Sequence, residues 1–478
     1  MKLILRQKIW LTIVLAANLA LWIIPSDIVE QIARDRHTML GRYSRTHFTW
    51  IVAIALISIV SFYIDWSQGA TYKRRWFRVT AAVIGLTPML IIADFFLRSE
   101  ERAHYIQDTL AYHHPPGGSY RRVSTDQPQA HRTYPDPPAG FDAVDCTLQI
   151  DRRGFRNQTD LDEYDIVVLG DSFAAGSNVS DEHPWPVRLA ALSGLSVYNL
   201  GMSGYAPIHY LASLKEYALA LRPRFVLCMI YEGNDFRSAK SDRKQKRPGF
   251  SKRLKRYVKQ SPIINTVDQF FIDSFGPMRS TRPVPGIEML DWLPLSIPES
   301  EPSRFYAFEP KQLRDLYQSP EDFALDKHWL NPRAQLREMN TLCKQAGCKF
   351  ILVFAPTKAH VTIPLVADRL SAGKVRSFTA ISYKKNLPPP DAFLDNLLAW
   401  VDAKETVIQE WCRREGIPFI GVTGALRKGA LAGRQVYYTY DQHWTPPGHE
   451  VVAQAVYDKL AGQLLETEAI ASKNLFRK

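Results

Sequence analysis

The stretch Tyr164–Gly176, YDIVVLGDSFAAG, constrains the fold of this chain more than any other. Its residues Ile166 to Leu169 form a short apolar run rich in β-branched side chains, which is typical of a buried parallel strand. Gly170-Asp171-Ser172 follows at once, and small residues after Phe173 allow a helix or tight loop to begin there. Open α/β sheets bind their ligands at the carboxyl ends of strands. The stretch therefore predicts that Ser172 is a nucleophile presented at such an end.

The rest of the soluble part alternates short apolar runs with helical patterns. Further strands are expected at residues 196–200, 225–231, 349–354 and 418–422, and helices at 185–192, 208–221, 335–346, 393–414 and 449–460. Strands and helices that alternate in this way indicate a parallel sheet covered on both faces. The fold class expected is α/β, with a parallel five-stranded sheet in a three-layer α/β/α arrangement.

Three apolar runs of near-membrane length occupy the first hundred residues: Ile9–Ile24, Phe48–Ile64 and Val79–Leu97. A helix needs about 20 residues to cross the hydrocarbon core. No small-residue cleavage site follows the first run, which favours a retained anchor over a signal peptide. Basic residues before run one and between runs two and three outnumber those between runs one and two, so the amino terminus is expected in the cytoplasm. Three crossings then put everything after Leu97 outside it, as in an integral protein of a bacterial inner membrane with a periplasmic domain.

These patterns divide the chain into a membrane anchor at 1–98, a proline-rich stalk and lead-in at 99–163, a catalytic domain at 164–465 and a tail at 466–478. Pro88 is expected to kink the third membrane helix. Within the catalytic domain, residues 236–331 are expected to be an insertion that leaves from the end of a strand, and its first part is strongly basic. The basic segment is either a solvated face or a clamp for acidic lipid or glycan.

The net charge of +12 favours anionic surroundings. Patterns typical of nucleic-acid-binding modules are missing from the sequence, so we expect no nucleic-acid partner. The five cysteines show no spacing suited to structural zinc. Cys228 is expected in the core, and Cys343 and Cys348 flank a helix end where they could pair outside the cytoplasm.

A serine nucleophile needs a base to take its proton, and the base is usually a histidine oriented by a carboxylate. Asp441 and His443 lie two residues apart in a loop before the last helix, at the sheet edge expected for Ser172. We assign His443 as the base and Asp441 as its orienting acid, whereas His449, at the helix start, is expected to cap or pack. Oxyanion donors are expected from the Ser172 N–H and from two residues after other strands, the Gly204 N–H and the Asn234 side chain.

Together these blocks resemble the SGNH, or GDSL-like, hydrolase superfamily. Gly170-Asp171-Ser172 matches its first block, Gly204 (or Gly201) its second, Asn234 its third and His443 its last. The family often has its acid three residues before the histidine, where this chain has Tyr440. The Asp441-x-His443-Trp444 form resembles instead the bacterial polysaccharide O-acetyltransferase branch. That branch also has a strand-Pro-x-Lys segment like Phe354–Lys358, for which a plain turn with an exposed lysine is the alternative.

The resemblance implies an SGNH, flavodoxin-like arrangement of the sheet and a Ser-His-Asp acyl-enzyme reaction that uses no metal or cofactor. Four neighbours of the motif positions are predicted as weaker substrate-binding residues: Asp171, Lys358, Trp444 and Tyr205. The expected activity is that of an esterase or O-acyltransferase on acylated glycan of the cell envelope, with a membrane acyl-donor protein as a further expected partner. Alternatives are a lipid or small-ester hydrolase and a non-catalytic glycan-binding assembly subunit.

Overall fold

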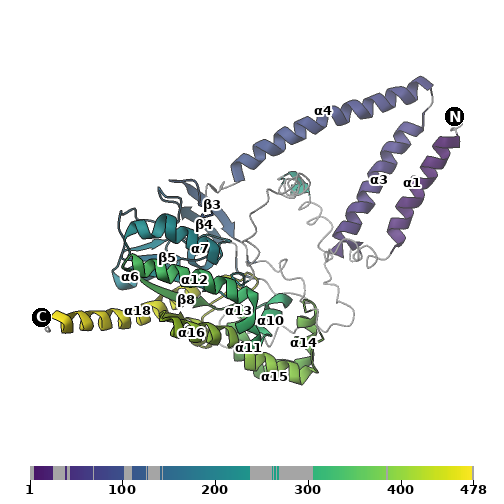
Figure 1. Cartoon of the computed structure of the whole chain (residues 1–478). Coiled ribbons are helices and arrows are strands. Elements are labelled where there is room, and N and C mark those ends of the chain that lie inside the picture. The colour runs from purple at the N-terminus through teal and green to yellow at the C-terminus, as the bar shows by residue number, and fades with distance from the viewer. Residues whose placement is uncertain are drawn as a thin grey trace. The chain divides into compact units, whose positions relative to one another are not determined.

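The computed structural model describes residues 5–24, 38–39, 43–67, 69–101, 110–124, 126, 140–142, 144–236, 261, 263–264, 266–267, 305–383 and 386–475 (Figure 1). The chain divides into two compact units. The first comprises residues 1–102 with 246–282, and the second comprises residues 103–245 with 283–478. The basic part of the predicted insertion falls almost entirely outside the described residues.

The described part of the first unit is built from three long helices: α1 (Leu5–Ile23), α3 (Arg45–Asp65) and α4 (Gly69–Glu101). A short antiparallel pair, β1 (Thr38–Met39) and β2 (Tyr43–Ser44), precedes α3. Two apolar segments, His47–Asp65 and Gly69–Ala93, are long enough to cross a membrane, whereas the apolar part of α1, Lys8–Ile23, is shorter. Two of the three predicted spans therefore meet the length expected of a membrane helix. Pro88, the predicted kink, lies inside α4 without ending it.

The second unit is organised around one parallel sheet. Its strands are β5 (Ile166–Leu169), β6 (Val197–Asn199), β7 (Phe225–Tyr231), β8 (Lys349–Ala355) and β9 (Phe419–Gly421), in the order β6-β5-β7-β8-β9. Each pair of neighbours is parallel. Because β6 lies on one side of β5 and the later strands β7, β8 and β9 lie on the other, the direction of strand progression reverses at β5, which is the switch point where such sheets bind ligands. The α/β fold with a parallel five-stranded sheet is confirmed.

Alternate strand residues enter two separate cores, one on each face of the sheet. Ile166 and Val168 of β5 pack into the first core, whereas Val167 and Leu169 pack into the second. Buried side chains of α6 (Trp185–Ser193), α10 (Pro310–Leu316), α14 (Ala372–Ala380), α15 (Pro390–Trp400), α17 (Thr423–Leu431) and α18 (Pro446–Leu475) join the first core. Those of α7 (Pro207–Ser213), α11 (Pro320–Leu325), α12 (Lys327–Gln345) and α16 (Ala403–Glu415) join the second. The predicted three layers result, and fully apolar strands such as β7 are what burial on both faces requires.

Several predicted helix boundaries differ from the structure. The single helix expected at 393–414 is interrupted at Val401 and Asp402, between α15 and α16. The helix expected at 208–221 is not α-helical throughout. The α-helix α7 is followed by a wider π turn, η2 (Leu214–Ala218), and then by a tighter 3₁₀ turn, η3 (Leu219–Leu221). The last helix continues to Leu475, into the segment predicted as a tail.

The segment predicted as a proline-rich spacer contains regular structure in its described residues. Strands β3 (Ser119–Ser124) and β4 (Val144–Gln149) pair antiparallel along six residues each. The prolines of this segment gave no sign of the pairing, because they precede β3 or lie between β3 and β4 in the sequence, and none lies within a strand. All five cysteines are buried and free, including Cys228 in the core of β7.

Candidate active site

Ser172 begins α5 (Ser172–Ala175), a four-residue helix directly after β5. The Asp171 carboxylate caps this helix by accepting from the N–H of Phe173 at 2.9 Å, and Gly176 ends it in the left-handed conformation with φ of 72°. A Cβ at Gly170 would lie 2.6 Å from the Cβ of Ala174, so only glycine lets the helix turn back this closely on the strand. The local sequence thus presents Ser172 at the carboxyl end of a central strand.

His443 and Asp441 lie in the loop before α18, which is fastened by a bridge between Tyr437 and Trp444. The Nε2 atom of His443 lies 2.7 Å from Oγ of Ser172, although 271 positions separate the two residues. On the other side of the ring, Nδ1 lies 2.6 Å from Oδ1 of Asp441, which also accepts from the backbone N–H of His443 at 2.8 Å. This chain of contacts has the geometry that activates a serine hydroxyl.

The electrostatics of the acid suit this arrangement. Burial by itself would raise the pKa of Asp441, but the hydrogen bonds from His443 and the nearby positive charge of Lys358 hold that pKa well below its usual range. Asp441 is therefore a carboxylate at neutral pH and orients the imidazole with its negative charge.

Two of the three predicted oxyanion donors lie beside the contacts that join Ser172, His443 and Asp441. Ser172 and Asn234 both line the same pocket as His443, and the Asn234 side chain is hydrogen-bonded to Asp171. Gly204 has φ of 84°, but it is not among the residues that line the pocket. Gly201, the alternative for the second block, serves as a spacer, because a Cβ there would lie 2.5 Å from the backbone nitrogen of Ala175.

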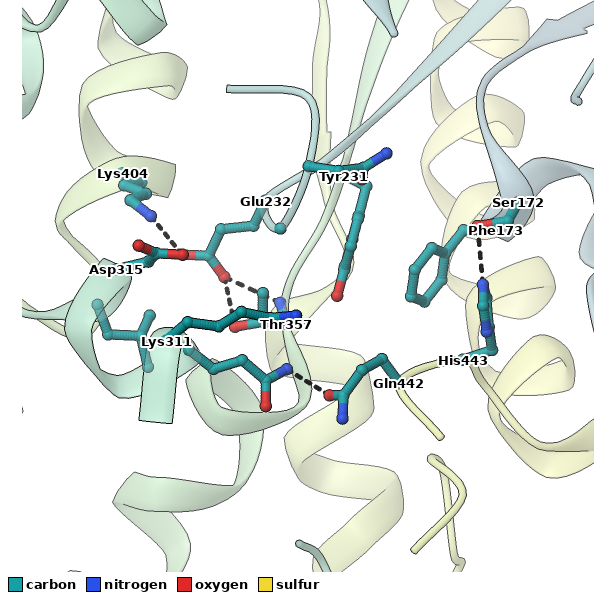
Figure 2. Close-up of a pocket in the computed structure, with 14 residues that line it drawn as sticks. Ser172, Phe173, Tyr231, Glu232, Lys311, Asp315, Thr357, Lys404, Gln442 and His443 are labelled. Atoms are coloured by element: carbon teal, nitrogen blue, oxygen red, sulfur yellow. Dashed lines mark hydrogen bonds and ion pairs between the residues drawn. The ribbon is translucent and has the colours of Figure 1, made fainter. Parts of the chain in front are cut away.

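The pocket has a volume of about 200 Å³ and two chemically different ends. Figure 2 shows Ser172, Phe173 and His443 at one end and Glu232, Lys311, Asp315 and Lys404 at the other, with Tyr231 between them. Phe173 stacks on Tyr231 with ring centres 4.1 Å apart and contacts the His443 ring at 4.9 Å, so an apolar wall adjoins the reacting groups.

Sequence reasoning missed a buried ion network behind the polar end of the pocket. The ring of His360 lies between two carboxylates, with Nδ1 3.0 Å from Glu232 and Nε2 2.8 Å from Asp402. Burial lowers the pKa of His360, but these carboxylates outweigh that effect and raise it to about 9. For Glu232, burial raises the pKa, and the charge of His360 outweighs it and lowers the pKa to about 2. The partners lie on different elements, so no local sequence signal could have identified them.

One group of side chains in the described residues, His360, Asp402 and Glu405, has ligand atoms close enough together for a metal ion. In this structure each ring nitrogen of His360 lies within hydrogen-bond distance of a carboxylate, Glu232 or Asp402, so the group forms an ion-pair network.

The four weaker substrate-binding candidates are placed differently from the prediction. Asp171, Lys358, Trp444 and Tyr205 are all buried, with at most 1% of each side chain exposed, and none lines the pocket. Tyr205 donates to the backbone oxygen of Tyr112, and Trp444 packs edge-on against Phe173. Their positions in or near the motifs made them candidates, but their side chains are buried away from the pocket. His449 is also buried, and its Nδ1 accepts from the Trp185 N–H at 3.3 Å, in line with a packing role.

Comparison with known proteins found a family match over part of the chain. Residues 316–475 match the family model described as SGNH hydrolase-like domain, acetyltransferase AlgX. The match includes Asp441 and His443 but begins after Ser172, Gly204 and Asn234. No curated protein matches the sequence.

Solved structures with some similarity include a putative lipolytic protein of the G-D-S-L family from Desulfitobacterium hafniense, with 10% identity and a TM-score of 0.28 over 62% of this chain and 98% of that one. Another is a mutant of Axe2, an acetyl-xylooligosaccharide esterase from a Geobacillus species, with 14% identity and a TM-score of 0.29 over 62% of this chain and 92% of that one. Likeness at this level says nothing of the substrate. The family match over residues 316–475 confirms the resemblance to SGNH hydrolases that the sequence indicated.

Proposed function

We propose that this protein is a membrane-anchored serine esterase or O-acyltransferase that acts on ester-linked acyl groups of cell-envelope polysaccharide. The observation that carries the proposal is the continuous contact from Asp441 through His443 to the Ser172 hydroxyl at the mouth of a pocket. The family model supports it, because its description names both a hydrolase-like domain and an acetyltransferase. The two apolar segments of the first unit, long enough to cross a membrane, support the anchoring.

In the proposed reaction, Nε2 of His443 accepts the proton of Ser172 as Oγ attacks an ester carbonyl. Asp441 stabilises the resulting imidazolium through the 2.6 Å contact to Nδ1. The negative charge on the carbonyl oxygen is held by the Ser172 N–H and the Asn234 amide, with Gly204 as the third proposed donor. His443 then returns its proton to the leaving alcohol, and a water molecule or a sugar hydroxyl resolves the acyl-enzyme.

The polar end of the pocket favours a carbohydrate ligand over a long acyl chain. Glu232, Lys311 and Lys404 line the end opposite Ser172, so an alkyl chain placed there would lie against three charged side chains. Burying charged groups against apolar surface is costly. We therefore place the small acyl group near Phe173 and the hydroxyl-rich part of the substrate toward Glu232.

Covalent labelling of the full-length protein with a fluorophosphonate tests the nucleophile. We expect labelling of the wild type and a loss of labelling in Ser172→Ala, because the Ser172 hydroxyl contacts Nε2 of His443. Ser193→Ala is the matched control, since Ser193 ends α6 and donates to Leu189 instead. Labelling that persists in Ser172→Ala would overturn the proposal.

Product release then separates glycan from lipid preference. We expect acetate release from acetylated xylan or peptidoglycan, and falling rates on p-nitrophenyl esters as the acyl chain lengthens. Rates that rise with chain length would instead favour a lipid or small-ester hydrolase.

A further inference from the structure

The loop that carries Asp441 and His443 is held by a buried lysine on one side. Nζ of Lys358, at the start of α13 (Lys358–Thr362), donates to three backbone oxygens of this loop. These are the oxygens of Tyr438 at 2.9 Å, Thr439 at 2.7 Å and Asp441 at 2.9 Å. An ammonium group has three N–H donors and no acceptor. All three are accounted for by the loop, so Lys358 has none left for a substrate.

A buried carboxylate binds the backbone N–H groups of the same loop. Asp126 accepts from the backbone N–H groups of Thr439 at 2.9 Å, Tyr440 at 2.8 Å and Asp441 at 2.9 Å. The two side chains therefore bind opposite polar groups of one short backbone segment, Lys358 its carbonyls and Asp126 its amides. They come from elements more than two hundred residues apart in the chain.

Both side chains are costly to bury, which points to a specific role. Lys358 is 0% exposed and Asp126 is 5% exposed. Burial lowers the pKa of Lys358 to about 7, against the opposing effect of the charges of Asp126, Asp441 and Glu309. Neither residue lines the pocket, so substrate contact does not explain them.

We propose that Lys358 and Asp126 are positioning residues: they fix the backbone at 438–441 so that the imidazole of His443 stays within hydrogen-bond distance of Ser172. The proposal rests on the proposed function, because it assigns these residues to the same Ser-His-Asp reaction. It also gives the strand-Pro-x-Lys segment, which ends at Lys358, a role within the protein. Displacing a catalytic group by about 1 Å costs on the order of 10²-fold in rate, so the loop needs such support.

Lys358→Met and Asp126→Asn, made in the full chain, test the two sides of the loop separately. Methionine keeps the length of the lysine side chain without its charge or donors, and asparagine puts an NH₂ group where the loop presents its own N–H groups. For each variant we expect kcat on p-nitrophenyl acetate to fall about 10²-fold, with a smaller effect on KM because neither substituted residue lines the pocket. The control is Leu397→Ala, a buried position on α15, for which we expect a lower Tm and an unchanged kcat.

The His443 ring proton in the short contact to Asp441 gives a second readout, by proton NMR. We expect a downfield imidazole N–H resonance in the wild type and in Leu397→Ala, and its loss or upfield shift in the two loop variants. A folded Lys358→Met protein that keeps both kcat and this resonance would overturn the proposal.

If neither loop variant folds, hydrogen exchange in the wild type decides the question. The amides of Thr439, Tyr440 and Asp441 should exchange slowly because Asp126 accepts from all three, and rapid exchange would overturn the proposal. Both the resonance and the exchange rates are measured without turnover. A wild type that fluorophosphonate does not label would therefore overturn the proposed function and leave the positioning of the loop testable.

Discussion

At the scale of single residues, the site depends on a few charged side chains whose partners are fixed by burial. His360 shows this most clearly, because its fully buried ring bridges Glu232 at the pocket and Asp402 between α15 and α16. A charge in such a position is stable only while its partners remain. The network therefore makes the stability of the domain sensitive to pH.

We predict that the His360 network stabilises the fold at neutral pH and loses this effect in mild alkali. The folded-state pKa of about 9 lies above the ordinary value of 6.5, so the stabilisation is complete below about pH 6.5 and declines as the pH rises through 9. This shift in the pKa of His360 corresponds to a contribution of at most about 3 kcal/mol to the free energy of unfolding. Urea unfolding of the wild type and His360→Gln at pH 6 and pH 9.5 measures it.

The comparison with the variant is needed because Lys358 titrates in the same pH range. Its titration changes the free energy of unfolding in the direction opposite to that of His360. We expect the difference in the free energy of unfolding between wild type and His360→Gln to shrink from pH 6 to pH 9.5. A difference that stays constant or grows would show that His360 is not held as an imidazolium.

At the scale of elements, short segments are kept in place by long-range contacts. Arg156, in the lead-in before β5, is almost fully buried and donates to the oxygens of Gly176 at 2.6 Å and Val179 at 2.8 Å, just after α5. It also pairs with Asp181 at 2.6 Å. The lead-in is therefore part of what holds the helix that begins with Ser172.

We predict that Arg156→Met lowers the free energy of unfolding by about 3–5 kcal/mol. The substitution removes the donor to Oδ1 of Asp181 and to three backbone carbonyls, those of Ala175, Gly176 and Val179. Arg152→Met is the matched control, since Arg152 pairs with Asp160 and Asp162 on an exposed surface, where such pairs contribute about 1 kcal/mol or less. Urea denaturation of both variants checks the prediction, and equal effects would contradict it.

A strand or helix could be predicted from the sequence where a single local pattern of residues determines it. The bounds of β5 and β7 follow directly from their apolar runs, since strands buried on both faces carry little else. The break at Asp402 was not predictable, because the carboxylate there accepts from His360 and Arg427, which come from other elements. The same holds for Asp126 and Arg156, whose contacts lie far away in the sequence. Ser172, His443, Asp441 and Asn234 were found because each follows a strand or precedes the last helix.

At the scale of the whole molecule, an apolar first unit precedes the sheet domain in the chain. The sheet domain has charged residues at its pocket, whereas α3 and α4 expose large apolar side chains such as Leu56, Phe62, Ile84 and Leu90. Exposed apolar surface of this extent is typical of a membrane or partner interface.

We predict that three crossings put the sheet domain outside the cytoplasm. An alkaline phosphatase fusion after Leu97 should be active, because that enzyme functions only outside the cytoplasm. A fusion after residue 68, between the second and third apolar runs, should be inactive. The reverse pattern of activities would contradict the orientation derived from the basic loops.

The loop whose backbone at 438–441 is held by Lys358 and Asp126 has a consequence for how this protein is synthesised. The groups that hold it come from residue 126 and residue 358, and the base itself is residue 443. A growing chain thus acquires its serine long before it acquires the means to activate it. Until the last tenth of the sequence has been synthesised and has folded back onto the sheet, Ser172 therefore lacks the base that the proposed reaction requires.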